Sequence, residues 1–448
     1  MLIRVIDVSA NGNEVSFRLS YSRPVKKYLL DENFFVRYDN HVETASIPQS
    51  ILVIPVVSMI APIAWAIGAD IEIDALDETY LRSLNNVRKV LTEWYPRFST
   101  SGTLNVRNVV RNQFGGTRTG LLFSSGLDSL TSYSMHKDEK PDLISVWARD
   151  PQLHEGGKWA CVMAAAQSLG KRDGVASLQI KTDLTYISDP LLSLEFGLSS
   201  WYADVAHGLL LLSVCAPITA ARDIGRVLIA SGTPPDRLEP WGSHPAIDNN
   251  VSWARVIATH DALDMSRQDK IRYMCAEDPE CLTKLKVCHF HPLNCGMCEK
   301  CLRTIAGLCI EGIDPRNCGF KVDDKTLNNV KRSIVTGRIA LADGEVVDWI
   351  DMQRFIAEEP GPDVIGSRDF LTWLRGYDFS RYRIGKWRSK LLWARLDLLL
   401  LYHFITANHM TRQNLKYLRY LAVCYLHVTL YRGRHLLAAS LRFRRPTP

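Results

Sequence analysis

The sequence predicts an α/β protein in which helices cover both faces of a parallel sheet. The first observation is a series of four short apolar segments, at 119–123, 142–148, 176–182 and 225–233. The second is that two segments with helical spacing of apolar residues lie between them, at 156–170 and 201–221. Strands that alternate with helices in this way are typical of a parallel sheet covered on both faces.

The length of 448 residues indicates about two or three domains. We expect an N-terminal α+β domain over residues 1–110, which begins with alternating, strand-like patterns and ends in a helical pattern at 80–95. The alternating strands and helices form a central domain over residues 111–320. A helical, basic C-terminal region follows over residues 321–448 and contains a Pro- and Gly-rich loop at 358–366.

The segment 51–69 has no charged residue over nineteen positions, which is long enough to span a membrane. However, Pro55 and Pro62 each interrupt a helix, and Gly68 loosens its end. An acidic stretch follows directly, and no Lys or Arg anchors either flank. We therefore expect a buried pair of short elements here and no membrane span.

Charge and cysteine content predict a cytoplasmic protein. Arg4 and Asp7 lie inside the apolar run at the N-terminus, so we expect no signal peptide. The eleven cysteines are an odd number, and four of them crowd into residues 288–301. This pattern fits a reducing compartment and a metal site better than a disulfide framework.

The net charge of +6 is unevenly distributed. Residues 381–448 contain fourteen Lys or Arg and one acidic residue, Asp397, whereas the preceding 380 residues are net negative. Tryptophans and tyrosines are interleaved with the basic residues, a composition that suits nucleic acid. A solvated helical face, an acidic partner and anionic lipid are alternatives for this region.

A phosphate cradle is predicted where the first central strand ends and a helix begins. Gly126 allows close approach of the backbone, the serine hydroxyls can donate to phosphate oxygens, and Asp128 can hold magnesium or cap the helix. No Gly-Lys-Ser/Thr sequence follows, so the loop is not a Walker loop. The alternative is a plain capped helix after a strand. The predicted cradle consists of Ser124, Ser125, Gly126, Leu127, Asp128 and Ser129.

A metal site is predicted from four cysteines at spacings of seven, three and three: Cys288, Cys295, Cys298 and Cys301. Four thiolates at such spacing can close tetrahedrally on Zn²⁺, with Gly296 easing the turn. An iron–sulfur cluster is the alternative, since a Cys-x₂-Cys-x₂-Cys pattern also serves those. His289 or His291 could replace one thiolate.

The segment SSGLDS resembles the SGGxDS signature of the PP-loop ATP pyrophosphatases, from which it departs at Ser125. Together with the cysteine cluster, it resembles the 7-cyano-7-deazaguanine synthase family over about residues 119–308. This resemblance implies ATP, Mg²⁺ and a structural zinc ion as cofactors. The first 110 residues and the last 130 have no counterpart in that family.

The resemblance also implies further site residues. His154, in ARDPQLHE, falls on the family's nucleotide-contacting histidine. Arg267, in MSRQDKI, takes the place of a lysine near the triphosphate, with Lys270 close by as a second phosphate-neutralising charge. His244 and Asp248 are substrate-binding candidates in GSHPAIDNN, for which a loop held by its own turns is the alternative.

The activity that the resemblance implies is adenylation of a carboxylate by ATP, with loss of pyrophosphate and attack by ammonia or an amine. The implied substrate is a deazapurine acid such as 7-carboxy-7-deazaguanine. Longer relatives in bacterial anti-phage operons suggest a partner protein as the acceptor of the deazaguanine. Two other interpretations remain: a transfer-RNA-modifying PP-loop enzyme, and a non-catalytic adaptor that binds ATP and zinc.

Overall fold

The computed structural model describes residues 1–99, 101–339, 341, 343–358 and 362–382. The helical segments expected beyond residue 383, and with them most of the basic region, lie outside the described residues.

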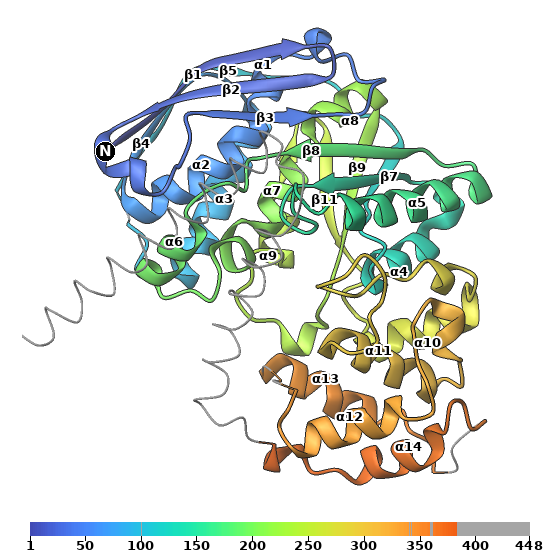
Figure 1. Ribbon diagram of the computed structural model, residues 1–448. Coiled ribbons are helices and arrows are strands. Elements are labelled where there is room, and N and C mark those ends of the chain that lie inside the picture. Colours follow the sequence, from blue (N-terminus) through green and yellow to red (C-terminus); the bar gives the residue numbers. More distant parts are fainter. Residues whose placement is uncertain (100, 340, 342, 359–361, 383–448) are drawn as a thin grey trace, which may run out of the picture.

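Eleven strands form one sheet in the order β10-β11-β9-β6-β7-β8-β3-β2-β1-β4-β5 (Figure 1). The strands are β1 (Leu2–Asn11), β2 (Glu14–Tyr21), β3 (Asn33–Arg37), β4 (Asp70–Asp77), β5 (Leu104–Val110), β6 (Arg118–Leu122), β7 (Asp142–Trp147), β8 (Ser177–Thr182), β9 (Ile224–Ala230), β10 (Ser252–Trp253) and β11 (Val256–Asp261).

The centre of the sheet is parallel and confirms the predicted α/β class. β6, β7, β8 and β9 coincide with the four expected strands, and each pairs in parallel with its neighbours in the series β11-β9-β6-β7-β8. The fifth parallel strand, β11, was not among the expected elements because its sequence, VIATHD, is short and ends in polar residues. The chain moves from β6 outward to β8, and then returns to the other side of β6 with β9. The strand order therefore reverses between β6 and β9.

The helices are α1 (Gln49–Leu52), α2 (Ile54–Ile67), α3 (Glu78–Trp94), α4 (Leu127–His136), α5 (Gly156–Asp173), α6 (Asp189–Phe196), α7 (His207–Ser213), α8 (Ala216–Arg222), α9 (Pro245–Asp248), α10 (Arg267–Glu277), α11 (Glu299–Ile310), α12 (Thr326–Val335), α13 (Asp343–Gln353) and α14 (Ser367–Gly376). Both faces of the parallel strands are covered, as expected. Leu121 of β6 packs in one core with α4, α5 and α10, whereas its neighbour Leu122 packs in another with α2, α3, α7 and α8.

The N-terminal strands continue the same sheet. β3 pairs antiparallel with β8, through Val36 opposite Thr182 and Arg37 opposite Lys181. The expected boundary at residue 110 falls at the end of β5, and strands from both sides of it share one sheet and one core. Helices α11 to α14 lie away from this end of the molecule, below the parallel strands in Figure 1.

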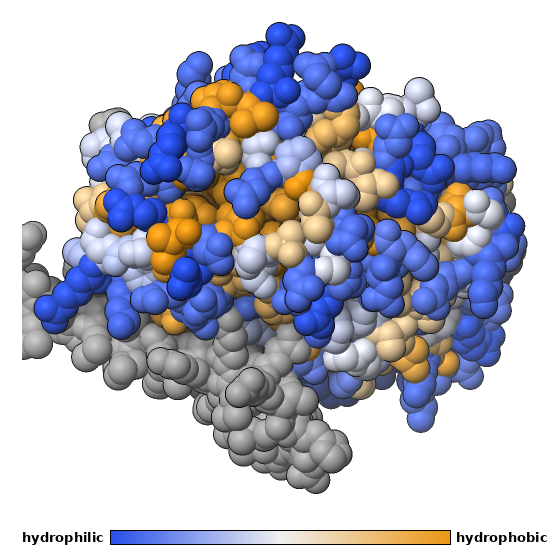
Figure 2. All heavy atoms as spheres, turned by 90° about the horizontal axis from the view of Figure 1, so that it is seen from above, coloured by the Kyte–Doolittle hydropathy of each residue, from blue (hydrophilic) through white to orange (hydrophobic). Residues whose placement is uncertain are grey.

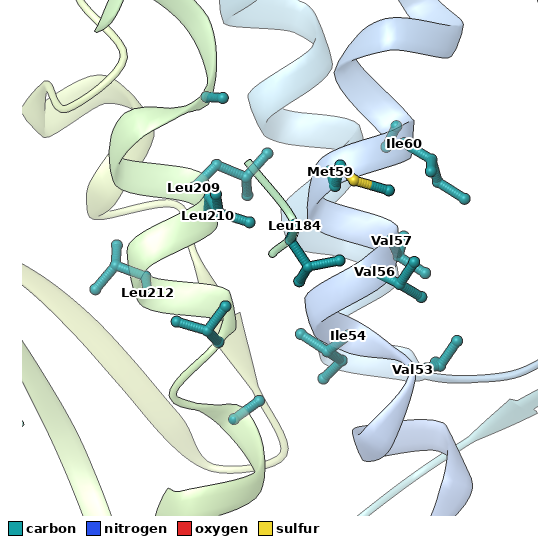
Figure 3. Packing of buried hydrophobic residues seen from close by; sticks show 14 of the residues in the cluster. Val53, Ile54, Val56, Val57, Met59, Ile60, Leu184, Leu209, Leu210 and Leu212 are labelled. Atoms are coloured by element: carbon teal, nitrogen blue, oxygen red, sulfur yellow. The ribbon is translucent and has the colours of Figure 1, made fainter. Parts of the chain in front are cut away.

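The uncharged segment 51–69 is buried in the core between the N-terminal and central strands. Figure 3 shows apolar side chains of α2 facing those of α7, with Leu184 between the two helices. The expectation that Pro62 interrupts the helix is wrong, since α2 runs through it. Burial on all sides of α2 outweighs the local cost of proline.

The expected helix at 201–221 is divided into a π-helical turn at Tyr202–Ala206, α7 and α8. Taken together, Tyr202–Arg222 is the one helical run in the described part of the chain that is long and apolar enough to cross a membrane, and 78% of its apolar window is buried inside the protein. A helix in the core of a soluble protein has the same length and apolar content.

An open hollow of about 940 Å³ lies between β1 and β4, which pair over only three residues before they diverge. Val5, Val8 and Ile73 line it together with Val53. Figure 2 looks down on this end of the molecule and shows apolar side chains gathered among charged ones.

Candidate functional site

The predicted cradle lies at the carboxyl end of β6, where the strand order reverses. Ligands of doubly wound sheets bind at such a point. The Ser124 side chain lies beside that of Ser129, with their hydroxyl oxygens 3.3 Å apart. Gly126 is the residue before α4 and has an extended backbone. The first free N–H groups of α4 follow directly, an arrangement that favours an anion.

Ser125 has a left-handed backbone, with a φ of 61°. Its side chain is fully buried, and the hydroxyl donates to the Lys284 carbonyl. The Lys286 N–H donates in turn to the Ser125 carbonyl at 2.8 Å. Ser125 therefore adopts a backbone conformation that is easy only for glycine. Its hydrogen bonds with residues 284 and 286 hold Ser125 in this conformation.

Asp128 forms an ion pair with Lys270 across the cradle. The Lys270 ammonium lies 2.8 Å from Asp128 Oδ1, is fully buried, and also donates to the Ser231 carbonyl at the end of β9. Burial raises the pKa of Asp128, but Lys270, Arg267 and Lys300 outweigh burial and hold this pKa below its usual range. Asp128 is therefore ionised at neutral pH.

A capping box fixes the start of α10, which carries two of the predicted cations. The Ser266 hydroxyl accepts from the Asp269 N–H, and the Asp269 carboxylate accepts from the Ser266 N–H. Arg267 is the first residue of α10, and its guanidinium donates to Thr304 Oγ1 at 2.9 Å. Lys270, one turn later, reaches Asp128 directly. The structure thus brings Asp128, Arg267 and Lys270 together, as the sequence predicts.

Two further cations of α11 belong to this cluster and were not among the predicted residues. Burial, and then the charge of Arg267, lower the pKa of Lys300, while Asp128 and Asp150 oppose the shift. Arg303 forms ion pairs with Glu299 and with Asp348. The only signal for Lys300 in the sequence is a lysine placed between two cysteines of the cluster, which local pattern alone does not connect with the cradle.

His154 lies in the loop before α5. Helix α5 itself contacts the cysteine segment. Lys158 of α5 donates to the His289 carbonyl at 2.5 Å. Burial lowers the pKa of His154, with Lys158 adding to the shift and Glu155 opposing it. The imidazole is therefore neutral at pH 7.

Asp248 and His244 belong to a second cluster, which is separate from the cradle. Asp248 is fully buried, and its Oδ2 accepts from the Ser243 hydroxyl and lies 2.7 Å from His260 Nδ1. Burial raises the pKa of Asp248 despite these partners. His244 caps α9 through its Nδ1 and packs edge-on against Trp94. Within the described residues, neither side chain shares a hydrogen bond or ion pair with the cradle.

The four cysteines of the predicted metal site lie together, with all sulfur atoms within 4.8 Å of one another. Cys295 and Cys301 have their Sγ atoms 3.8 Å apart, and Cys288 and Cys298 have theirs 4.0 Å apart. A zinc–sulfur bond of about 2.3 Å implies a tetrahedral edge of about 3.8 Å, so the site could hold one metal ion such as zinc. Neither His289 nor His291 belongs to this ligand group.

The backbone of the cysteine segment is arranged to favour thiolates. N–H groups of His291, Met297 and Cys298 donate to the sulfur atoms of Cys288 and Cys295. Hydrogen bonds from the thiols of Cys298 and Cys301 lower the pKa of Cys288, and the same contacts raise the pKa of Cys298 and of Cys301. Gly296 has a φ of 68°, and a Cβ atom there would lie 2.4 Å from the Lys321 carbonyl oxygen, so glycine is required at this turn.

No protein-family model, curated protein or solved structure matches this chain. The candidate sites therefore rest on the residues and distances described above.

Proposed function

We propose that this protein is an ATP-dependent enzyme of the PP-loop type, which adenylates a carboxylate and releases pyrophosphate. One observation carries the proposal: the Asp128–Lys270 ion pair, with Arg267 beside it, lies at the cradle at the carboxyl end of β6. That position is where doubly wound sheets bind their ligands.

The cations of α10 suit a polyphosphate. Lys270 and Arg267 would neutralise the charge that builds up on a departing pyrophosphate. Asp128 would hold Mg²⁺, which supplies further charge neutralisation when it is bound. The Ser124 and Ser129 hydroxyls and the N–H groups at the start of α4 would bind phosphate oxygens, whereas the Ser125 hydroxyl is turned away toward the Lys284 carbonyl.

Adenylation suits a carboxylate substrate because a carboxylate lacks a good leaving group, which AMP provides. We propose a deazapurine acid such as 7-carboxy-7-deazaguanine as the substrate, on the resemblance of the cradle and the cysteine cluster to the deazaguanine synthases. Ammonia, or an amine of a partner protein, would then attack the acyl-adenylate. The cysteine cluster would hold a structural zinc ion, since four thiolates leave no open position for substrate.

The test is product analysis after purified protein is incubated with ATP, Mg²⁺, 7-carboxy-7-deazaguanine and an ammonium salt. Wild type should form AMP and pyrophosphate only when the acid is present. Asp128→Asn should reduce this rate by about 100-fold or more, because it removes the carboxylate at the cradle. The control is Asp138→Asn, an exposed aspartate on the segment after α4, which should behave like wild type.

Formation of ADP in place of AMP would contradict the proposal. ATP binding without turnover would favour the non-catalytic adaptor. Turnover that requires added transfer RNA would favour an RNA-modifying enzyme. Matching thermal unfolding midpoints of wild type and both variants would show that the variants are folded.

A further inference from the structure

The sheet opens between its neighbouring strands β1 and β4. These strands are parallel and pair only over residues 2–4 and 70–72. Ile6 is an extra residue in β1, because the pairing of β1 with β2 shifts register between Val5 and Asp7. A bulge of this kind bends the strand that carries it, and the pairing with β4 ends just before the bulge.

The opening forms a slot in the sheet, which we call the β1–β4 slot. It is the hollow of about 940 Å³, and its two sides are residues 4–8 of β1 and 72–75 of β4. Gln49 of α1 and Val53, the residue after α1, line it from the helical layer. The slot is therefore open through the sheet to the helices beneath, and no described strand lies between its sides.

Both sides of the slot present backbone groups that lack a strand partner. Beyond residue 4, β1 pairs only with β2, and beyond residue 72, β4 pairs only with β5, among the strands of the described structure. A strand with one partner directs alternate N–H and C=O groups to its free side.

Side-chain amides partly occupy the free sides of the two strands. The amide of Gln49 lies 3.5 Å from the Val8 carbonyl, and the amide of Asn108 lies 3.2 Å from the Asp74 carbonyl. Gln49 and Asn108 are both exposed. The backbone N–H groups of an incoming strand could replace these donors, so the slot suits an extended chain that pairs with both sides.

The inner side of the slot is apolar. Val5 and Val8 of β1 are half-buried, Ile73 of β4 is buried, and Val53 lies with them. Side chains of a strand alternate between the two faces of a sheet, so every second side chain of an occupant would meet this apolar surface.

The outer side of the slot is charged and has one unpaired acid. Arg4 pairs with Glu72, and Arg107 pairs with Asp74. Asp7 is exposed and has neither a hydrogen bond nor an ion pair within the described residues. The outward side chains of an occupant would therefore meet a negative charge that favours lysine or arginine.

We propose that the β1–β4 slot is a docking site for an extended segment of a partner protein, in which apolar side chains alternate with polar ones that include lysine or arginine. The segment would add a strand between β1 and β4. The unpaired part of β4, residues 73–77, matches the usual strand length of about five residues. The inference does not depend on the proposed nucleotide site.

The first test measures peptide binding to the full chain by fluorescence anisotropy. The probe is the labelled peptide KVKVKVK, which alternates valine with lysine. N-methylation of its valines should weaken binding by about 10-fold or more, because it removes backbone donors worth about 1 kcal/mol each. The peptide EVEVEVE should bind about 10-fold more weakly, although the net charge of +6 on the chain would attract it more in general.

Two variants locate the binding in the slot. Asp7→Lys should weaken binding of KVKVKVK by about 3-fold to 10-fold, because it reverses the unpaired charge. Ala75→Phe should weaken binding of both charged peptides by about 10-fold, because it fills space that Ala75 leaves open in the slot. Asp138→Lys, at an exposed aspartate outside the slot, is the matched control and should bind like wild type. Thermal unfolding midpoints show which variants are folded, and Asp7→Lys at an exposed position keeps the test valid if Ala75→Phe is not.

The second test is amide hydrogen exchange with and without KVKVKVK. Binding should slow exchange in residues 5–11 and 73–77, which form the two sides of the slot. Protection of the β5 edge alone would overturn the proposal, because the peptide would then pair with a free sheet edge. No binding up to about 1 mM, or equal binding of the N-methylated peptide, would also overturn it. Protection of the same residues when the protein alone is concentrated would make a second copy the occupant and contradict a partner protein.

Discussion

Ser125 has a left-handed backbone at the position where the PP-loop signature, which this segment resembles, has glycine. A non-glycine residue in the left-handed region costs about 1 to 2 kcal/mol. The hydrogen bond from the buried hydroxyl to the Lys284 carbonyl, and the one that the Ser125 carbonyl accepts from Lys286, offset part of this cost. The serine is therefore compatible with the conformation of the loop.

Substitutions at Ser125 should separate strain from side-chain contacts. Ser125→Gly relieves the strain but loses the hydrogen bond to Lys284, so the free energy of unfolding should change by less than about 1 kcal/mol. Ser125→Val places a β-branched side chain at a positive φ in a buried position and should cost about 2 to 4 kcal/mol. Urea unfolding measures both. Equal stability of the two variants would show that backbone strain at this position is unimportant.

At the scale of elements, the end of α4 is tied to the end of β11 by a charged contact. His136, the last residue of α4, has its Nε2 3.0 Å from Asp261 Oδ1 and its Nδ1 2.8 Å from Glu139 Oε1. The hydrogen bond with Asp261 raises the pKa of His136, and Glu139 adds to the shift, against the effect of burial. This contact stabilises the fold while the imidazole is protonated.

The contribution of His136 to stability should therefore depend on pH. A raised pKa in the folded state stabilises the protein fully below the unfolded pKa of about 6.5, and this gain is lost as the pH rises through the folded pKa. His136→Gln should cost roughly 1 kcal/mol more at pH 5.5 than at pH 9. Denaturant unfolding at the two pH values measures the difference, with the exposed His41→Gln as control. A cost independent of pH would mean that His136 acts only by packing.

At the scale of the whole molecule, the N-terminal strands and helices complete the core of the parallel sheet. α2 packs against α7 with Leu184 between them (Figure 3), and β3 pairs with β8. Removal of residues 1–110 would expose the apolar face of α7 and one edge of β8. An exposed apolar face and an unpaired strand both favour aggregation.

A fragment of residues 111–448 should therefore lack the cooperative thermal unfolding transition of the full chain. The missing part buries apolar side chains along the whole length of α2, and burial of this kind supplies most of the stability of a fold. Calorimetry on the fragment and the full chain measures the difference, and co-expression of residues 1–110 as a separate chain should restore the transition. A fragment with a sharp transition of its own would instead mark residue 110 as a true domain boundary.

The sequence by itself predicted the parallel strands, the loop of small residues after β6 and the grouping of the four cysteines, because each depends on local pattern. Apolar runs of strand length predict β6 to β9, a turn of small hydroxylated residues predicts the loop after β6, and regular spacing predicts the cysteine cluster. Arg267 and Lys270 came from the resemblance of one segment to a known family. β11 was missed, and α2 was expected to break at Pro62, because pairing and burial overrule local propensity.

Only the tertiary structure decided which of these residues meet. It pairs Asp128 with Lys270 across 142 positions of sequence and leaves Asp248 in a separate buried cluster. It also joins residues on both sides of position 110 in one sheet. Contacts between distant segments depend on how sheet and helices pack, and a pattern read along the chain carries no information about that packing.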